Sequence, residues 1–145
     1  WPTGRGYSEE LASAFDRGTE PLLYITITPR EMTSGMTDRL GSIYAQLFDG
    51  PPLDGPAGLL VQPLEMDRGY DGEALVISTS DNDPYVARCP VNAARSSIAE
   101  TGTCLHDFQT GQGLSVTYRF PVSWIEDWRA VDALVRNRMI AIEAR

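Results

Sequence analysis

The chain has 145 residues, and we expect residues 1–145 to form a single globular domain of ordinary size. Its net charge of −8 argues against nucleic acid or an anionic membrane surface as a partner. All 12 basic residues are arginine, which excludes lysine-based catalysis. This composition is typical of a GC-rich genome, and we expect a bacterial one. No apolar run reaches about 18 residues, the length of a membrane-spanning helix.

The first third of the chain predicts a helix, a strand and a second helix. Residues 8–17 have the apolar face and the polar cap of a short helix. Residues 22–28 alternate between apolar and polar side chains, which is typical of a strand, and Pro29 ends it. Residues 34–48 change to helical spacing, and a loop rich in proline and glycine follows at 50–58.

The rest of the chain consists mostly of predicted strands. They cover residues 59–64, 74–78, 85–89, 104–109 and 114–120. Pro63 lacks a backbone N–H and favours an edge position for the first of them, whereas apolar residues on both faces favour a central position for the second. The last two form a hairpin, and its second strand turns one side toward the core. These core-facing residues are Leu114, Val116, Tyr118 and Phe120.

Ser123 and Glu126 form the pattern of a capping box at the start of a long C-terminal helix. Its apolar stripe consists of Trp124, Trp128, Val131 and Val135. Such a stripe is typical of a core rather than of a ligand pocket. We therefore expect an α+β fold, in which a mostly antiparallel sheet of five or six strands is covered on one face by the central and C-terminal helices. The strand order does not follow from the sequence.

The two cysteines, Cys89 and Cys104, lie near the ends of neighbouring predicted strands. Such ends can reach the Cα spacing of a disulfide, typically about 5.5 Å, and we predict that bond. The alternatives are two free buried thiols or a functional pair. Because disulfides persist outside the reducing cytosol, we expect a periplasmic or extracellular protein. The sequence starts at Trp1 without an initiator methionine, so we expect an upstream signal peptide, membrane anchor or tag.

His106 is the single histidine and the first candidate for chemistry. On a strand it shares a face with Cys104, and with Cys89 the three residues could form a nucleophile pair or part of a metal site. Asp107 points to the opposite face, however, and a second histidine is absent from the sequence. We therefore predict no catalytic residue, no metal and no cofactor, with His106 packed or hydrogen-bonded in the interior.

Two groups of acidic side chains could supply oxygen ligands for calcium. One is Asp81-Asn82-Asp83, and the other consists of Asp67, Asp71 and Glu73. Neither has the spacing of an EF-hand loop, so we interpret both as turns. Gly111 and Gly113 belong to a hairpin turn and do not precede a helix, which excludes a phosphate-binding loop there.

These observations favour a non-enzymatic domain, exported or tethered to a membrane, that binds a protein or another ligand. The alternative is a small hydrolase that uses Asp/Glu chemistry with His106 as a participant. An immunity- or inhibitor-type protein would fit the acidic charge but has no motif behind it. A deep cleft joining His106 to two carboxylates would favour the hydrolase, and an exposed apolar patch would favour the binding domain.

Overall fold

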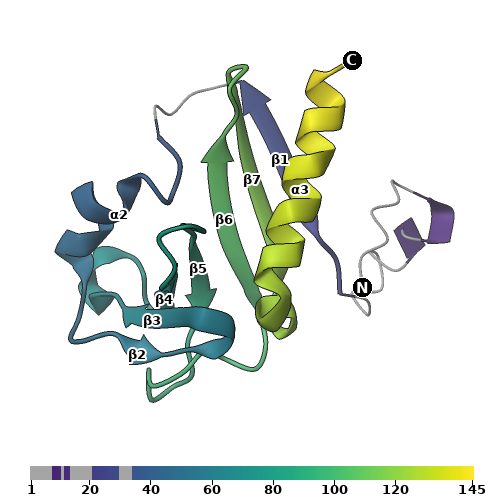
Figure 1. The fold of residues 1–145 in the computed structure, drawn as a ribbon. Coiled ribbons are helices and arrows are strands. Elements are labelled where there is room, and N and C mark those ends of the chain that lie inside the picture. Colours follow the sequence, from purple (N-terminus) through teal and green to yellow (C-terminus); the bar gives the residue numbers. More distant parts are fainter. Residues whose placement is uncertain (1–7, 11, 14–20, 30–33) are drawn as a thin grey trace.

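A seven-stranded antiparallel sheet organises the chain, in the order β1-β7-β6-β5-β4-β3-β2 (Figure 1). The computed structural model describes residues 8–10, 12–13, 21–29 and 34–145. The strands are β1 Tyr24–Pro29, β2 Leu53–Asp54, β3 Leu59–Pro63, β4 Glu73–Ser78, β5 Val86–Pro90, β6 Thr103–Gln109 and β7 Leu114–Pro121. The predicted α+β class fits this sheet and its helices, but the predicted count of five or six strands is wrong. The missed strand is β2, whose two residues are too few to show an alternating pattern.

Of the two predicted strand positions, the edge position of β3 is wrong and the central position of β4 is confirmed. β2 pairs with β3 and covers it, so Pro63 does not mark an edge strand. β4 is central as predicted, because it lies between β3 and β5. Of the predicted helix over residues 8–17, residues 9, 10, 12 and 13 are helical and Ser8 is not, while residues 11 and 14–17 lie outside the described residues.

The central and C-terminal helices lie on opposite faces of the sheet, not on one face as predicted. They are α2 Arg39–Ser42 and α3 Trp128–Glu143 (Figure 1). In β4, Ala74 and Val76 belong to the core that contains the buried side of α3. The intervening Leu75 belongs to a second core, which contains Tyr44 and the half-buried Leu40 of α2. A strand with apolar side chains on both faces needs a cover on each of them, which explains the arrangement.

The segment predicted as one helix over residues 34–48 is irregular. α2 has only four residues, and a 3-10 turn, Tyr44–Leu47, follows it. Gly41 and the β-branched Ile43 both lower the helix propensity of this segment. Met36 is nevertheless buried, as its spacing predicted. The pattern thus identified apolar residues that pack on the sheet but overestimated the length of the helix.

The chain enters α3 through a 3-10 segment, Val122–Asp127, and not through the predicted capping box at Ser123. Val122, Ile125 and Trp128 are buried at intervals of three residues, the period of a 3-10 helix. In this described segment neither N-cap makes a side-chain cap hydrogen bond. From Trp128 onward the predicted stripe is confirmed. The buried residues of α3 are Trp128, Val131, Val135 and Met139.

A disulfide crosses the junction between β5 and β6. The ladder of this fully described junction registers a single pair, Arg88 with Leu105, whereas β6 and β7 form an extended ladder. Cys89 and Cys104 are the adjacent pair in the same register, and they form the predicted disulfide. The bond therefore joins the β1-β7-β6 part of the sheet to the β5-β4-β3-β2 part where backbone pairing is sparse. A disulfide is consistent with an oxidising extracellular or periplasmic environment.

Removal of this disulfide should destabilise the fold. The two cysteines are 15 residues apart in sequence. A cross-link over such a loop stabilises by about 3 kcal/mol in the chain-entropy model, so the double variant Cys89→Ser/Cys104→Ser should lose about that unfolding free energy in urea. Wild-type protein from an oxidising compartment should show no alkylated cysteine by mass spectrometry without reductant. Alkylation of both thiols in the folded protein would contradict the bond.

Trp128→Ala should remove the main apolar anchor of α3. The Trp128 side chain is 1% exposed, and its Nε1 donates to the carbonyl oxygen of Ala57 at 3.2 Å. We expect a loss of about 3–5 kcal/mol in the free energy of unfolding, the usual range for a buried large aromatic. The half-buried Trp124 provides the control, since Trp124→Ala should cost clearly less. Similar losses in the two variants would show that Trp128 has no special role.

Candidate functional site

The single histidine lies in a stack of aromatic rings between α3 and the sheet. Trp128 stacks on Tyr85 with ring centroids 4.4 Å apart, and Tyr85 stacks on His106 of β6 at 4.6 Å. All three side chains are buried. The first half of α3 is thereby placed directly over His106, which makes this cluster the first place to look for chemistry.

A chain of hydrogen bonds leads from this stack to the side of α3. Tyr118 Oη donates to Asp132 Oδ1 at 2.9 Å, and Arg136 Nε donates to Asp132 Oδ2 at 2.7 Å. The hydroxyl oxygens of Tyr85 and Tyr118 are 3.1 Å apart. Because Tyr118 gives its one proton to Asp132, the proton between the tyrosines comes from Tyr85. Burial raises the pKa of both tyrosines and keeps them as donors, so every donation runs toward the Asp132 carboxylate.

His106 lies beside this chain of hydrogen bonds, and only one of its two ring nitrogens has a hydrogen-bond partner among the described residues. Its Nδ1 lies 2.6 Å from the carbonyl oxygen of Val86, which can only accept, so Nδ1 carries the proton. Its Nε2 has no hydrogen-bond partner among the described residues and lies 3.9 Å from Asp132 Oδ1. Burial lowers the pKa of His106, and Arg136 acts in the same direction, against the Val86 carbonyl and Asp132. The imidazole is therefore neutral near pH 7.

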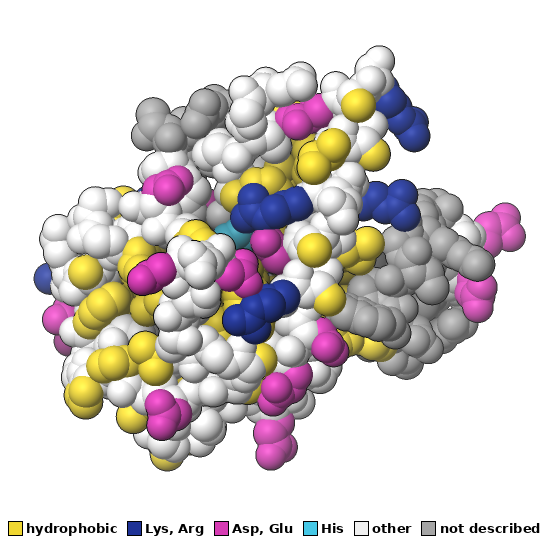
Figure 2. Space-filling model, in the orientation of Figure 1, with side chains coloured by type: hydrophobic (Ala, Val, Ile, Leu, Met, Phe, Trp, Pro, Cys, Tyr) yellow, Lys and Arg dark blue, Asp and Glu magenta, His cyan; other side chains and the backbone are white. Residues whose placement is uncertain are grey.

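The structure does not assemble the nucleophile pair or the metal site that the sequence raised. Cys104 lies near His106 on β6 but is bonded to Cys89. Asp107 lies on the opposite face, where its Oδ2 pairs with Arg39 Nη2 at 2.6 Å. Within the described ranges no three His, Cys, Asp or Glu side chains are placed to hold a metal ion. Figure 2 shows the imidazole (cyan) at the bottom of a narrow gap, and the side chain is only 1% exposed.

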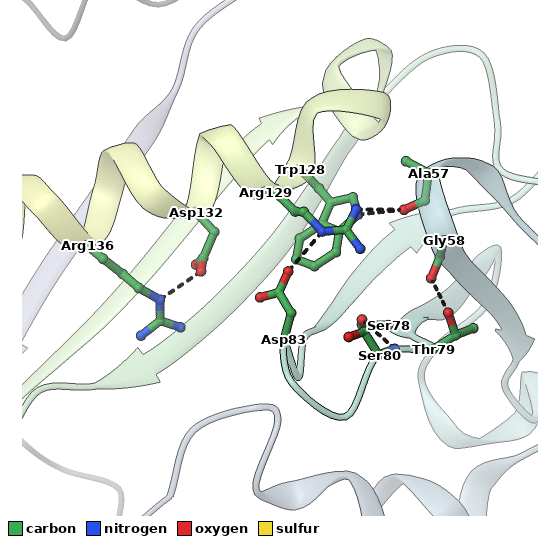
Figure 3. Close-up of polar contacts among 10 residues, drawn as sticks. All are labelled: Ala57, Gly58, Ser78, Thr79, Ser80, Asp83, Trp128, Arg129, Asp132 and Arg136. Carbon is green, nitrogen blue, oxygen red and sulfur yellow. Dashed lines mark hydrogen bonds and ion pairs between the residues drawn. The ribbon is translucent and has the colours of Figure 1, made fainter.

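The two acidic groups contribute to turns and ion pairs. Asp83 Oδ2 accepts from Arg129 Nε of α3 at 2.9 Å, and Glu73 pairs with Arg88 across β4 and β5 at 2.9 Å. Figure 3 shows Arg129 and Arg136 projecting from the same side of α3, each toward a carboxylate. The other acidic members, Asp67, Asp71 and Asp81, are exposed and spread over separate turns. This arrangement gives no support to a calcium site.

The two edges of the sheet are built differently. β2 has two residues, directly follows Pro51-Pro52 and carries Asp54. Short length, proline and charge are the devices by which proteins protect an edge strand. β1 at the other edge has six residues and no charged side chain, and its only ladder within the described part of the chain is with β7. β1 has none of these devices before its last residue, Pro29.

β1 also exposes large apolar side chains. Ile25 and Ile27 are 39% and 41% exposed, and Tyr24 is exposed as well. Because Ile25 and Ile27 lie opposite Tyr118 and Val116 of β7, they face the side of the sheet that carries α3. The alternating sequence pattern predicted this strand but indicated no site on it. An alternating pattern does not distinguish an edge strand from an interior one, and the available signal was the absence of charge.

Comparisons with known proteins give no family for this chain. No protein-family model matches it. No curated protein and no solved structure matches it either. In the part of the chain that the structure describes, no helix is both long and apolar enough to cross a membrane.

His106 should make the fold less stable in mildly acidic solution. The pKa of an unfolded histidine is about 6.5, and burial lowers the pKa of His106 in the folded chain. Below about pH 6.5 the unfolded state binds more protons, so the free energy of unfolding should fall by up to about 1.4 kcal/mol per pH unit. The contribution of His106 to the free energy of unfolding is thus fully present above about pH 6.5, and it is lost as the pH falls toward the pKa that His106 has in the folded chain.

The measurement is urea unfolding from about pH 8 to about pH 5, above the range in which most carboxylates titrate. No second histidine is present in the sequence, so His106→Gln should remove the slope. An unchanged slope in a folded His106→Gln protein would assign the effect to carboxylates instead.

Proposed function

We propose that this chain is a non-enzymatic binding domain that works outside the cytosol, with or without a membrane tether, and recognises an extended segment of a protein. The observation that carries the proposal is β1, an uncharged edge strand with exposed Ile25 and Ile27. The unpaired backbone groups of such an edge can pair with a strand of another chain, and proteins normally protect them. The short, proline-flanked and charged β2 edge of the same sheet supports a function for β1, which has no charged side chain.

The recognition mode that fits this edge is addition of a further strand beside β1. In that mode backbone hydrogen bonds provide affinity, and the alternation of side chains provides specificity. Ile25 and Ile27 face the α3 side of the sheet, and Thr26 and Thr28 face the other side. The partner segment that complements β1 is therefore an uncharged strand. Its apolar side chains lie on the α3 side of the sheet, and its hydroxyl side chains lie on the other side.

The hydrolase alternative has less support. A general base needs an open site beside it, whereas the His106 side chain is buried. The nearest carboxylate, Asp132, is already held by Tyr118 and Arg136. The Cys89–Cys104 disulfide supports the location that we propose, because such bonds persist in oxidising compartments.

A short acetylated peptide in which threonine and valine alternate is a suitable probe of this edge. We expect it to bind β1 in an NMR titration and to slow amide hydrogen exchange along the strand. Ile27→Lys should weaken binding at least about tenfold, because the lysine places a charge against the apolar face of the peptide. Ile140→Lys is the matched control, since Ile140 is 64% exposed on α3, and it should leave the affinity unchanged.

The same peptide with N-methylated backbone amides tests the hydrogen-bonding mode. It should not bind, because it cannot donate to the outer edge of β1. Equal binding of both peptides, or equal weakening by Ile27→Lys and Ile140→Lys, would contradict strand addition at β1.

A further inference from the structure

We infer that the strand which pairs with β1 is the β1 of a second copy of this chain; this inference rests on the proposed function of the β1 edge. The residues of β1 are arranged almost symmetrically about Thr26, with Ile25 and Ile27 on either side of it. Two identical antiparallel strands pair across a two-fold axis, and the same patch is used by both copies. A two-fold axis through Thr26, perpendicular to the sheet, brings the two edges together.

Side chains of the same kind meet in this register. Ile25 lies opposite Ile27 of the partner subunit, so the isoleucines of both copies gather on the face that carries α3. On the other face Thr26 lies opposite its own symmetry mate, and Tyr24 lies opposite Thr28 of the partner subunit. Threonine pairs and pairs of an aromatic with a β-branched residue stabilise antiparallel sheets, each by about 0.2–1 kcal/mol.

Neighbouring registers fit less well. A shift of one residue places Thr26 opposite Ile27, so isoleucine meets threonine on both faces. An axis through Ile27 places Pro29 opposite Ile25, and proline has no backbone N–H to donate. An axis through Ile25 pairs Ile27 with Leu23, which lies outside β1. The register about Thr26 therefore pairs residues 24–28 without a mismatch and leaves only Pro29 opposite a residue outside β1.

The distribution of charge favours the same occupant. Residues 24–29 carry no charged side chain, so two copies meet without like charges in the ladder, and a cationic segment would find no complement there. The net charge of −8 on each copy still opposes their approach. Salt screens this repulsion, so the association should strengthen as ionic strength rises. A contact held by ion pairs would weaken instead.

The first test is the oligomeric state of the 145-residue chain by analytical ultracentrifugation at low and raised salt. We expect a dimer that is tighter at raised salt. Ile27→Lys should raise its dissociation constant at least about tenfold, and Ile140→Lys should leave it within about twofold. Circular dichroism checks folding, and Ile25→Lys replaces Ile27→Lys if that variant does not fold. A dimer that survives these β1 variants would overturn the inference.

Single cysteines test the register. Thr26→Cys places two cysteines opposite each other, where Cα atoms of antiparallel strands lie about 4.5–5.5 Å apart, within reach of a disulfide. Thr28→Cys alone should not cross-link, but its mixture with Tyr24→Cys should. Cys89 and Cys104 are fully buried in their own disulfide, so the introduced thiol is the reactive one. Cross-linking by Thr28→Cys alone, with none by Thr26→Cys, would overturn the pairing.

Self-pairing and the proposed function can fail separately. A wild-type chain that remains monomeric at raised salt but binds the threonine–valine peptide would overturn the self-pairing and leave β1 as a binding edge. A monomer that also fails to bind this peptide would overturn both.

Discussion

The stack of Trp128, Tyr85 and His106 ties α3 to the sheet, and the rest of the inner core is arranged around it. Its two ring contacts, at 4.4 and 4.6 Å, link the first turn of α3 to the start of β5 and to β6. The same turn also reaches the loop before β3. Trp128 Nε1 and Arg129 Nη1 both donate to the carbonyl oxygen of Ala57, at 3.2 and 3.0 Å. One helical turn thus contacts the β5-β4-β3-β2 part directly, through Tyr85 and Ala57, and reaches β6 through the ring of Tyr85.

The contact between α3 and Ala57 is accompanied by backbone strain at Ala57. Its φ of 52° lies in the left-handed region, which a residue with a Cβ rarely adopts. The conformation persists because its surroundings hold it, and here the two donors from α3 are joined by a neighbouring bond from Thr79 N to Gly58 O at 3.1 Å. Backbone strain at this loop is therefore offset by contacts to α3 and to the end of β4.

The junction between β5 and β6 explains why a histidine without an evident chemical role is buried here. With a single registered ladder pair, this junction depends on other links. The Cys89–Cys104 disulfide is one, and the contact from His106 Nδ1 to the Val86 carbonyl oxygen is another, at 2.6 Å. Asparagine or leucine could fill part of the same space, but the flat imidazole also stacks on Tyr85. The residue joins the two parts of the sheet and supports the helix above it.

The sequence predicted features that depend on local pattern. The alternation of Leu114, Val116, Tyr118 and Phe120 correctly located β7 and its core-facing side. The disulfide followed from the position of Cys89 and Cys104 near adjacent strand ends. Features that depend on the arrangement of distant segments did not follow. The opposite placement of α2 and α3, the 3-10 entry at Val122, and the edge position of β1 all required the strand order or the packing of the core.

The strand order also has a consequence for how the chain is made. β2, β3, β4 and β5 pair with their neighbours in sequence, so this part of the sheet can form from local contacts. β1 pairs with β7, the last strand of this sheet in sequence order, and closing so long a loop carries a larger entropic cost. During synthesis β1 leaves the ribosome long before β7 exists. Ile25 and Ile27 therefore gain their partners on β7 only after residue 118 has been synthesised.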